Sequence, residues 1–415
     1  MPDRASLLAT IPLNTHDIPQ SLLNIENKNR SNPFPWKGQF SPQFVQALLE
    51  RYATVNTVVL DPFLGSGTVL HEAGRLKMEA LGTEINPAAY LMAQVYRFIN
   101  VDLETRRTCV ERVSAMLRDV LPRSMPMLGA PICVYERGEI ISRLCGLQGT
   151  VNNTAHKILL EALIVLLDFW KPDLNESRLY SVWKTLARQV LSLPISERPI
   201  RIFNCDARHL PISDQSVNLI ITSPPYINVQ NYHQQFRRST EAIGWNLLDV
   251  ARSEIGSNRK NRGNRFLTVI QYCVDMAMAL VEMRRVCISS GRIIAVLGRE
   301  TNVRGTAFYN GDIVARLAKQ CAGLEIEMRQ ERVFYNRFGL RVYEDILHFA
   351  RTDQDDYNVE EKARCVAHQA LLESLLEAPC ESKEDIQAAL LKATSVHPSP
   401  MYGTLNLRNN IEGSS

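Results

Sequence analysis

The 415-residue sequence predicts an α/β fold built on a mostly parallel sheet. The apolar run 58–60 leads into a glycine-rich turn and a helix, as in the nucleotide-binding opening of a doubly wound sheet. A second strand, 80–84, ends in a carboxylate. The run 216–221 stops at two prolines, which end a strand and fix an extended turn. We therefore expect a ligand site at the carboxyl ends of these strands.

Composition fits an enzyme of the cytoplasm with room for two or three domains. The sequence contains no run of about 18 apolar residues and no apolar N-terminal core, so neither a membrane span nor export is expected. Its nine cysteines form no Cys-x-x-Cys pair, which argues against a zinc site or a disulfide framework. The formal net charge is only +3, so affinity for nucleic acid has to come from local basic patches.

The glycine turn spans residues 61–68, and a helix is expected from about Val69 to Leu76. It is not a phosphate-binding loop, because no lysine follows the last glycine. It is not a dinucleotide fingerprint either, because Leu70 stands where the third glycine would be. The candidate cofactor-binding residues of the turn are Asp61, Pro62, Phe63, Gly65, Gly67 and Thr68.

Two further acids follow predicted strands. Glu84 lies 17 residues after Gly67, where a carboxylate can accept hydrogen bonds from the ribose hydroxyls of a nucleoside. Alone it would be an ordinary surface acid, but its register with the glycine turn favours the cofactor role. The second acid is Asp206, because the run 201–207 reads as a strand that ends in an acid.

The turn after the strand 216–221 presents the groups that amine chemistry on a flipped-out base requires. A hydroxyl and a carbonyl can accept the two hydrogens of an exocyclic amine, and an aromatic ring can stack on the base. The candidate catalytic residues are Ser223, Pro224, Pro225 and Tyr226.

The turn 223–226 resembles motif IV of the amino-methylating DNA methyltransferases, in the version usual for cytosine N4. Residues 61–68 resemble motif I of the same family, which binds S-adenosylmethionine. More loosely, the segment 32–38 resembles motif X, which packs over the methionine end of the cofactor and makes Phe34 a candidate contact. The resemblance covers roughly residues 30–100 and 200–350. It implies that Asp206 contacts the adenine amine of the cofactor.

The resemblance also implies the rest of the fold: a Rossmann-like methyltransferase sheet of seven strands with an antiparallel edge hairpin. We expect the hairpin at 324–329 and 342–349, a strand at 291–298, and helices at 42–52, 266–286 and 312–321. Motif IV follows motif I here, whereas the common cytosine-N4 order places it first. This departure leaves the location of the target-recognition region open.

Four segments are expected. Residues 1–28 form an N-terminal arm, and residues 29–100 and 198–352 form the catalytic domain. Residues 101–197 form a helical insertion, a candidate recognition or clamp domain, with helices at 105–120 and 155–170. The helical tail 353–415 includes a helix at 359–377, and its Pro379-Cys380 pair follows no strand and is not a catalytic candidate.

A basic patch follows the catalytic turn, with seven cations against three acids between residues 228 and 265. Arginine and lysine there can hold phosphates. A solvated loop that contacts nothing is the alternative, and adjacency to Tyr226 favours contact with double-stranded DNA. In the insertion, residues 178–188 could face DNA, yet an ordinary amphipathic helix explains them equally well. The loop 335–338 is a candidate wall of the base pocket. The candidate DNA-binding residues are Arg237, Arg238, Arg259, Lys260, Arg262 and Arg265.

Together these features predict direct methyl transfer from S-adenosylmethionine to N4 of a flipped-out cytosine, with no metal or covalent intermediate. The cytosine choice rests on Ser223, because adenine enzymes more often carry Asp or Asn there. We expect a role in restriction–modification or phage defence, with a cognate restriction endonuclease as a partner. The alternatives are an adenine-N6 enzyme, an RNA or other amine methyltransferase, and a non-catalytic binding subunit. The intact motifs argue against the last.

Overall fold

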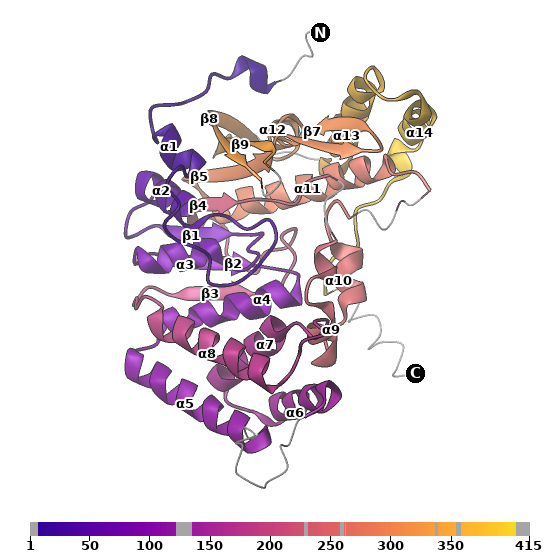
Figure 1. The fold of residues 1–415 in the computed structure, drawn as a ribbon. Coiled ribbons are helices and arrows are strands. Elements are labelled where there is room, and N and C mark those ends of the chain that lie inside the picture. The colour runs from indigo at the N-terminus through magenta and orange to yellow at the C-terminus, as the bar shows by residue number, and fades with distance from the viewer. Residues whose placement is uncertain are drawn as a thin grey trace, which may run out of the picture.

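The computed structural model describes residues 7–121, 135–227, 231–257, 261, 263–336, 339–353 and 358–403. A single seven-stranded sheet forms the centre of the molecule, in the strand order β3-β2-β1-β4-β5-β9-β8 (Figure 1). None of the helices within these ranges combines the length and apolar character needed to cross a membrane.

The sheet confirms the predicted α/β fold. The first five strands pair in parallel, and β9 is antiparallel to both β5 and β8, which makes the expected edge hairpin. The hairpin strands are longer than predicted, and a separate two-stranded hairpin, β6–β7, was not predicted. The strands are β1 (Val58–Asp61), β2 (Glu79–Thr83), β3 (Ile200–Phe203), β4 (Val217–Thr222), β5 (Cys287–Gly298), β6 (Glu300–Val303), β7 (Thr306–Tyr309), β8 (Leu324–Tyr335) and β9 (Arg341–Arg351).

Helices cover both faces of the sheet. Successive strand residues point to opposite faces, so Val59 and Ile294 belong to one apolar cluster while Leu60 and Ile293 belong to the other. The first cluster includes α2 (Pro42–Tyr52), α3 (Thr68–Arg75) and α4 (Pro87–Gln94). The second includes α11 (Leu267–Val286), α12 (Asn310–Cys321) and α13 (Val359–Leu375). Three shorter helices are α1 (Gln20–Asn24), α9 (Arg237–Ala242) and α10 (Leu247–Ser253).

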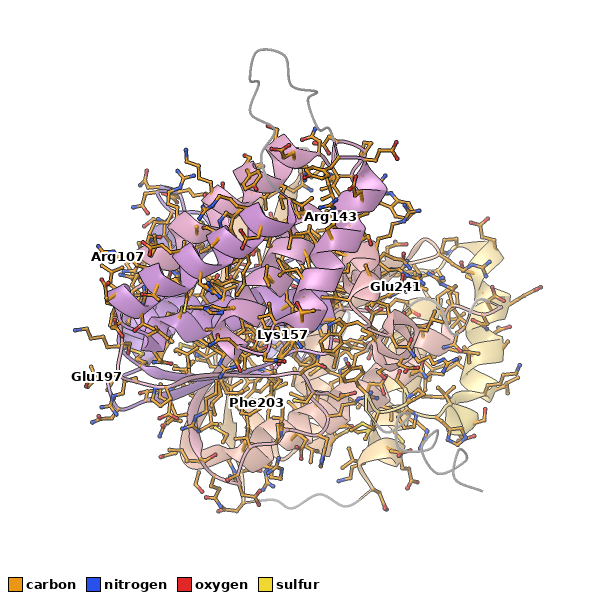
Figure 2. The ribbon with its side chains drawn as sticks, turned by 90° about the horizontal axis from the view of Figure 1, so that it is seen from below. Arg107, Arg143, Lys157, Glu197, Phe203 and Glu241 are labelled. Carbon is orange, nitrogen blue, oxygen red and sulfur yellow. The ribbon has the colours of Figure 1, made fainter. Side chains whose placement is uncertain are left out.

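Residues 101–197 contain four helices, and Figure 2 shows them gathered on one side of the sheet, with Phe203 of β3 below them. The predicted helix 155–170 ends earlier, because Asp168 adopts a left-handed backbone (φ 50°). The third of these helices packs on α4 within the first apolar cluster, so residues 101–197 share an apolar core with the helices on that face of the sheet. The helices are α5 (Leu103–Val120), α6 (Arg137–Thr150), α7 (Thr154–Leu167) and α8 (Glu176–Ser192).

The C-terminal tail folds back on the second face of the sheet. The helix predicted at 359–377 is confirmed as α13, which ends at Leu375. A further helix, α14 (Cys380–Leu391), was not predicted. After it the chain returns toward the sheet, and Arg208 donates hydrogen bonds to the carbonyls of Ser399 and Pro400.

Candidate functional site

The glycine turn joins β1 to α3 by a backbone path that only glycine fits easily. Gly67 caps α3 with a left-handed backbone (φ 94°), and a Cβ added there would lie 2.6 Å from the ring of Tyr96. Leu64 N donates to the Thr83 carbonyl at 3.0 Å, which ties the turn to the end of β2. The turn is therefore packed tightly against both neighbouring elements.

Two carboxylates stand at the ends of β1 and β2, that of Asp61 buried and that of Glu84 partly buried. Glu84 accepts hydrogen bonds from the backbone N–H groups of Gly65 and Asn86, both at 2.8 Å. Asp61 accepts from the Thr222 hydroxyl at 2.7 Å and from Phe63 N at 3.1 Å. Burial raises the pKa of each carboxyl to about 7. The bond to Thr222 connects the cofactor turn to the residue directly before Ser223.

These elements surround one cavity of about 430 Å³ at the carboxyl ends of the strands. Most of the predicted cofactor and catalytic residues lie in its wall, whereas Gly67 and Phe34 do not. The predicted residues that line it are Asp61, Pro62, Phe63, Gly65, Thr68, Glu84, Asp206, Ser223, Pro224, Pro225 and Tyr226.

The turn 223–226 packs on the end of β5. The ring of Tyr226 packs on Gly298, where an added Cβ would lie 2.9 Å from the ring. The Tyr226 hydroxyl lies 3.3 Å from Ser223 Oγ, and burial raises the pKa of this phenol. Asn310 fixes the surroundings by donating to the Gly298 carbonyl at 2.9 Å. The ring and the serine hydroxyl thus occupy set positions in the cavity wall.

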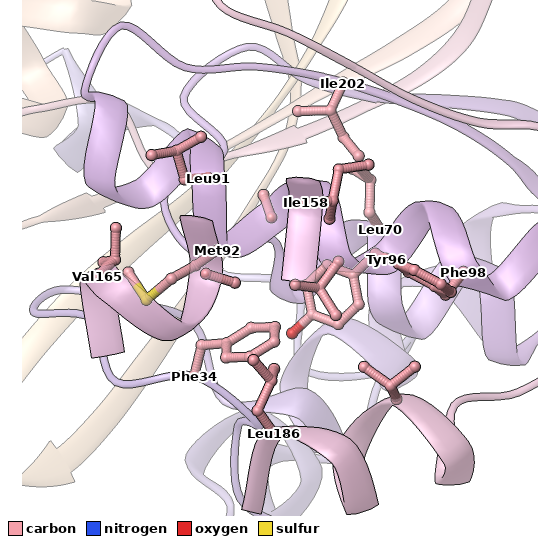
Figure 3. Packing of buried hydrophobic residues seen from close by; sticks show 14 of the residues in the cluster. Phe34, Leu70, Leu91, Met92, Tyr96, Phe98, Ile158, Val165, Leu186 and Ile202 are labelled. Carbon is pink, nitrogen blue, oxygen red and sulfur yellow. The ribbon is translucent and has the colours of Figure 1, made fainter. Parts of the chain in front are cut away.

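The structure corrects the prediction for Phe34. This side chain is buried in the first apolar cluster, its ring centroid 5.4 Å from that of Tyr96, and Figure 3 shows it beside Leu186. It packs under the glycine turn instead of facing the cavity. Trp36 of the same segment and Phe40, just beyond it, line the cavity, and Trp36 stacks on Tyr232 with centroids 6.1 Å apart. The proline-aromatic segment 32–38 indicated a contact with the cavity, but Phe34 was chosen instead of Trp36, and Phe40 was not predicted.

Asp206 lies in the cavity wall, and its carboxylate is already engaged. It accepts hydrogen bonds from Arg208 Nε at 2.9 Å and Nη2 at 2.7 Å, and from Tyr402 N at 3.2 Å. Arg208 also donates to Asp275 at 2.6 Å. The contact of Asp206 with the cofactor adenine stays a prediction, and it requires the carboxylate to accept a further bond. The partners of Asp206 come from distant segments that no motif indicated.

Glu254, which the sequence did not indicate as a site residue, also lines the cavity. Glu254 accepts hydrogen bonds from His233 N and from the His233 imidazole, both at 2.7 Å. The imidazole is completely buried. The pair fixes the segment after the catalytic turn, close to Tyr232, which faces the same cavity.

The basic patch borders a second hollow of about 1020 Å³, which shares Lys37 and Gly38 with the cavity. Arg237 and Arg238 line this hollow. Arg237 pairs with Glu241 at 2.7 Å, and the Arg238 guanidinium lies 3.8 Å from the ring centroid of Trp170. Trp170 and its neighbour Lys171, both from the insertion, also line the hollow.

The other four predicted DNA contacts are not among the described residues that line the second hollow. Arg259, Lys260 and Arg262 lie outside the described residues. Arg265 is described but lines neither the cavity nor the second hollow. In the loop predicted to wall the base pocket, residues 337 and 338 lie outside the described residues, and Tyr335 is 71% exposed and does not line the cavity. Its neighbour Phe334 lines the cavity.

Comparison with known proteins finds similarity to DNA methyltransferases over part of the chain. Residues 14–95 match the family model described as DNA methylase. The chain is 30% identical over 112 residues to the type II methyltransferase M.MjaII of Methanocaldococcus jannaschii, a match covering 26% of this chain and 20% of that protein. It is 37% identical over 76 residues to the type II methyltransferase M.BsoBI of Geobacillus stearothermophilus, covering 18% and 15%. The matches thus span about a fifth or less of these relatives.

Among solved structures, the chain resembles a SAM-dependent methyltransferase from Methanosarcina mazei at 10% identity and a TM-score of 0.34, covering 74% of this chain and 98% of that one. The family match supports S-adenosylmethionine as the cofactor.

Proposed function

We infer that this chain, whose segment 14–95 belongs to the family of amino-methylating DNA methyltransferases, transfers a methyl group from S-adenosylmethionine to an exocyclic amine of a DNA base. The observation that carries the proposal is the hydrogen bond between Thr222 and Asp61. It brings the cofactor turn and the Ser-Pro-Pro-Tyr turn into the wall of one cavity.

The residues present fit the cofactor. Each Glu84 oxygen accepts one backbone hydrogen bond, and a carboxylate oxygen can accept another, so the ribose hydroxyls can be bound there. Trp36 and Phe40 supply apolar walls, and Gly65 lets the backbone approach closely. Asp61 supplies negative charge near the ligand. The bound cofactor contributes a methyl group activated by its sulfonium.

The catalytic turn would prepare the amine for attack. The lone pair of an exocyclic amine is delocalised into the base ring, which makes the nitrogen a poor nucleophile. The Ser223 hydroxyl and the Pro224 carbonyl would accept the two amine hydrogens and favour a pyramidal nitrogen. Tyr226 would hold the flipped base by stacking, a contact worth about 1–3 kcal/mol in single-strand binders. Positioning of this kind converts a bimolecular encounter into an effectively unimolecular step.

We propose duplex DNA as the substrate, bound over the second hollow. The hollow shares the lining residues Lys37 and Gly38 with the cavity, and four cations line it against one acid, Asp168. The Arg238 guanidinium is stacked on Trp170, which holds a flexible cation ready for a phosphate. Phe169 N donates to the buried Ser239 Oγ at 2.9 Å, so the insertion and α9 form this surface together.

We propose cytosine N4 as the methylated atom, on the strength of Ser223, and a role in restriction–modification or phage defence with a cognate endonuclease. Adenine N6 is the alternative. Both choices use the same cavity and the same chemistry.

The test is incubation with S-adenosylmethionine and mixed-sequence duplex DNA, followed by nucleoside digestion and mass spectrometry. We expect N4-methylcytosine from the wild type and none from Tyr226→Ala. Tyr335→Ala is the matched control, because this exposed ring is away from the cavity. Only N6-methyladenine would overturn the cytosine choice. No methylated base in DNA, despite binding of S-adenosylhomocysteine, would overturn DNA as the substrate.

A further inference from the structure

Arg332 of β8 and Glu344 of β9 are two charged residues in the cavity wall for which the chemistry above has no use. They are directly opposite in the antiparallel pair, and Arg332 Nη1 lies 3.2 Å from Glu344 Oε2. Their side chains are only 11% and 16% exposed. Burial raises the pKa of Glu344, and Arg332 opposes that rise. Because a buried ion pair often adds little net stability, stability alone does not explain this one.

The pair lies next to the catalytic tyrosine. Glu344 pairs with Gly298 across the sheet, and the Cβ direction of Gly298 points at the ring of Tyr226. Residues directly opposite on paired strands project from the same face. Tyr226, Glu344 and Arg332 therefore lie in a row above three neighbouring strands. Two strand spacings make that row about 10 Å long, with Glu344 at its middle.

The guanidinium of Arg332 has an unused donor. Its Cζ atom lies 4.7 Å from the ring centroid of Phe44 and 4.6 Å from that of Phe334, so aromatic contacts hold it in place. Nη1 donates to Glu344, whereas the buried Nε has no hydrogen-bond partner among the described residues. Nε and Nη2 form the edge of the guanidinium that offers two parallel donors. A buried donor without a partner is costly unless a ligand satisfies it.

We propose that Arg332 reads the ring edge of the target base and selects cytosine, an inference that rests on the proposed function. With the amine at Ser223 and the ring on Tyr226, cytosine presents two neighbouring acceptors, N3 and O2, to the Nε–Nη2 edge. Adenine presents N1 and, beside it, a C–H group, so one arginine donor would stay unpaired. Glu344 acts as a positioning residue that fixes the guanidinium through Nη1.

The first experiment measures the ratio of N4-methylcytosine to N6-methyladenine formed in mixed-sequence duplex DNA. A good bidentate contact discriminates between bases by about 1–3 kcal/mol, so Arg332→Met should lower this ratio between about fivefold and 150-fold. Methionine keeps the apolar contacts with Phe44 and Phe334, and Arg332→Lys keeps the charge without the fork. Arg292→Met is the matched control, because Arg292 also pairs with a glutamate, Glu327, and lies over a ring, Tyr52, outside the cavity.

The second experiment isolates the contact with N3. Duplexes carrying 3-deazadeoxycytidine in place of deoxycytidine keep the amine and O2 but lack the N3 acceptor. For each protein, the kcat/KM on cytosine duplexes is divided by the kcat/KM on the analogue duplexes. This quotient should be at least fivefold larger for the wild type than for Arg332→Met. The intrinsic reactivity of the analogue cancels in this double comparison. Thermal stabilisation by S-adenosylhomocysteine should be equal in all variants, which checks that each one folds.

A ratio and an analogue effect that are the same in Arg332→Met and the wild type would overturn the inference and leave the methyltransferase function intact. Equal losses on both bases, together with weaker binding of S-adenosylhomocysteine, would also overturn it, because they indicate a structural role. A wild type that methylates adenine alone would also overturn the inference that Arg332 selects cytosine. A wild type that methylates no DNA base would overturn the proposed function and this inference together.

Discussion

The hydroxyl of Thr222 donates a 2.7 Å hydrogen bond to Asp61 Oδ1 across the parallel pair β1–β4. Asp61 belongs to the glycine turn, and Thr222 directly precedes Ser223. Both side chains are buried, so the bond is shielded from water. The two halves of the site are therefore joined by a contact between side chains as well as by the sheet itself.

Binding of the cofactor should depend on pH through Asp61. Burial raises the pKa of this carboxyl to about 7, so the group is largely protonated at pH 6. The cofactor carries positive charge, which favours the ionised carboxylate. We expect affinity for S-adenosylmethionine to rise between pH 6 and 8 and then to level off. Calorimetry at several pH values measures this, and Asp61→Asn should make the profile less steep, leaving only the part due to Glu84, whose pKa is also about 7. An unchanged profile in that variant would exclude Asp61 as the titrating group.

The same burial should appear in the stability of the protein without cofactor. Asp61 and Glu84 both have pKa values raised to about 7, against about 4 in an unfolded chain. Between these values the folded state binds more protons than the unfolded state, so their contribution to stability falls as pH rises from 4 to 7. Chemical denaturation should show that Glu84→Gln gains stability relative to the wild type as pH increases. A constant difference across this range would contradict the raised pKa of Glu84.

Gly67 should not tolerate a side chain. Its φ is 94°, and a Cβ would lie 2.6 Å from Tyr96, so Gly67→Ala should lower the free energy of unfolding by about 1–3 kcal/mol. The matched change is Gly146→Ala in α6, where a Cβ would meet nothing within 4 Å. That variant should gain about 0.5–1 kcal/mol. Urea denaturation of both proteins measures the difference, and equal effects would contradict the packing under the turn.

Lys171 should contact a DNA phosphate. Each phosphate contact contributes about 0.9 to the slope of log K against log salt concentration, so Lys171→Ala should reduce the slope by about that amount. Trp170→Ala should weaken binding as well, because it releases the stacked guanidinium of Arg238. Fluorescence anisotropy with labelled duplex at several salt concentrations measures both effects.

Lys184→Ala is the control for this surface. Lys184 lines a separate hollow between α5 and α8, together with Arg118 and Arg188. We expect its salt slope to equal that of the wild type. A reduced slope for Lys184→Ala with an unchanged one for Lys171→Ala would place the DNA on α8 instead.

The sequence predicted the sheet and the turns at its strand ends, because those features depend on residues that are close in the chain. The side that an aromatic ring faces depends on tertiary packing, which is why Phe34 was expected in the cavity and Trp36 was found there. The β6–β7 hairpin turns at Arg304 and Gly305, both with positive φ. A type I′ turn needs this conformation, and an Arg-Gly pair is a weak signal for it.

Long-range polar pairs were also missed. Arg208 meets Ser399, and Arg332 meets Glu344 across a hairpin longer than the sequence predicted. The pairing register of such strands is set by the whole sheet, and spacing along the chain does not reveal it.

The hydrogen bonds of Arg208 and Asp206 join the cavity wall to residues 399–402, which are synthesised last among the residues that complete it. Asp206 lines the cofactor cavity, yet its carboxylate and its arginine are completed by backbone groups of Ser399, Pro400 and Tyr402. A ribosome that has released only the catalytic strands and α11 has not yet supplied these groups. The wall of the cavity around Asp206 therefore reaches its final form only after residues 399–402 have emerged.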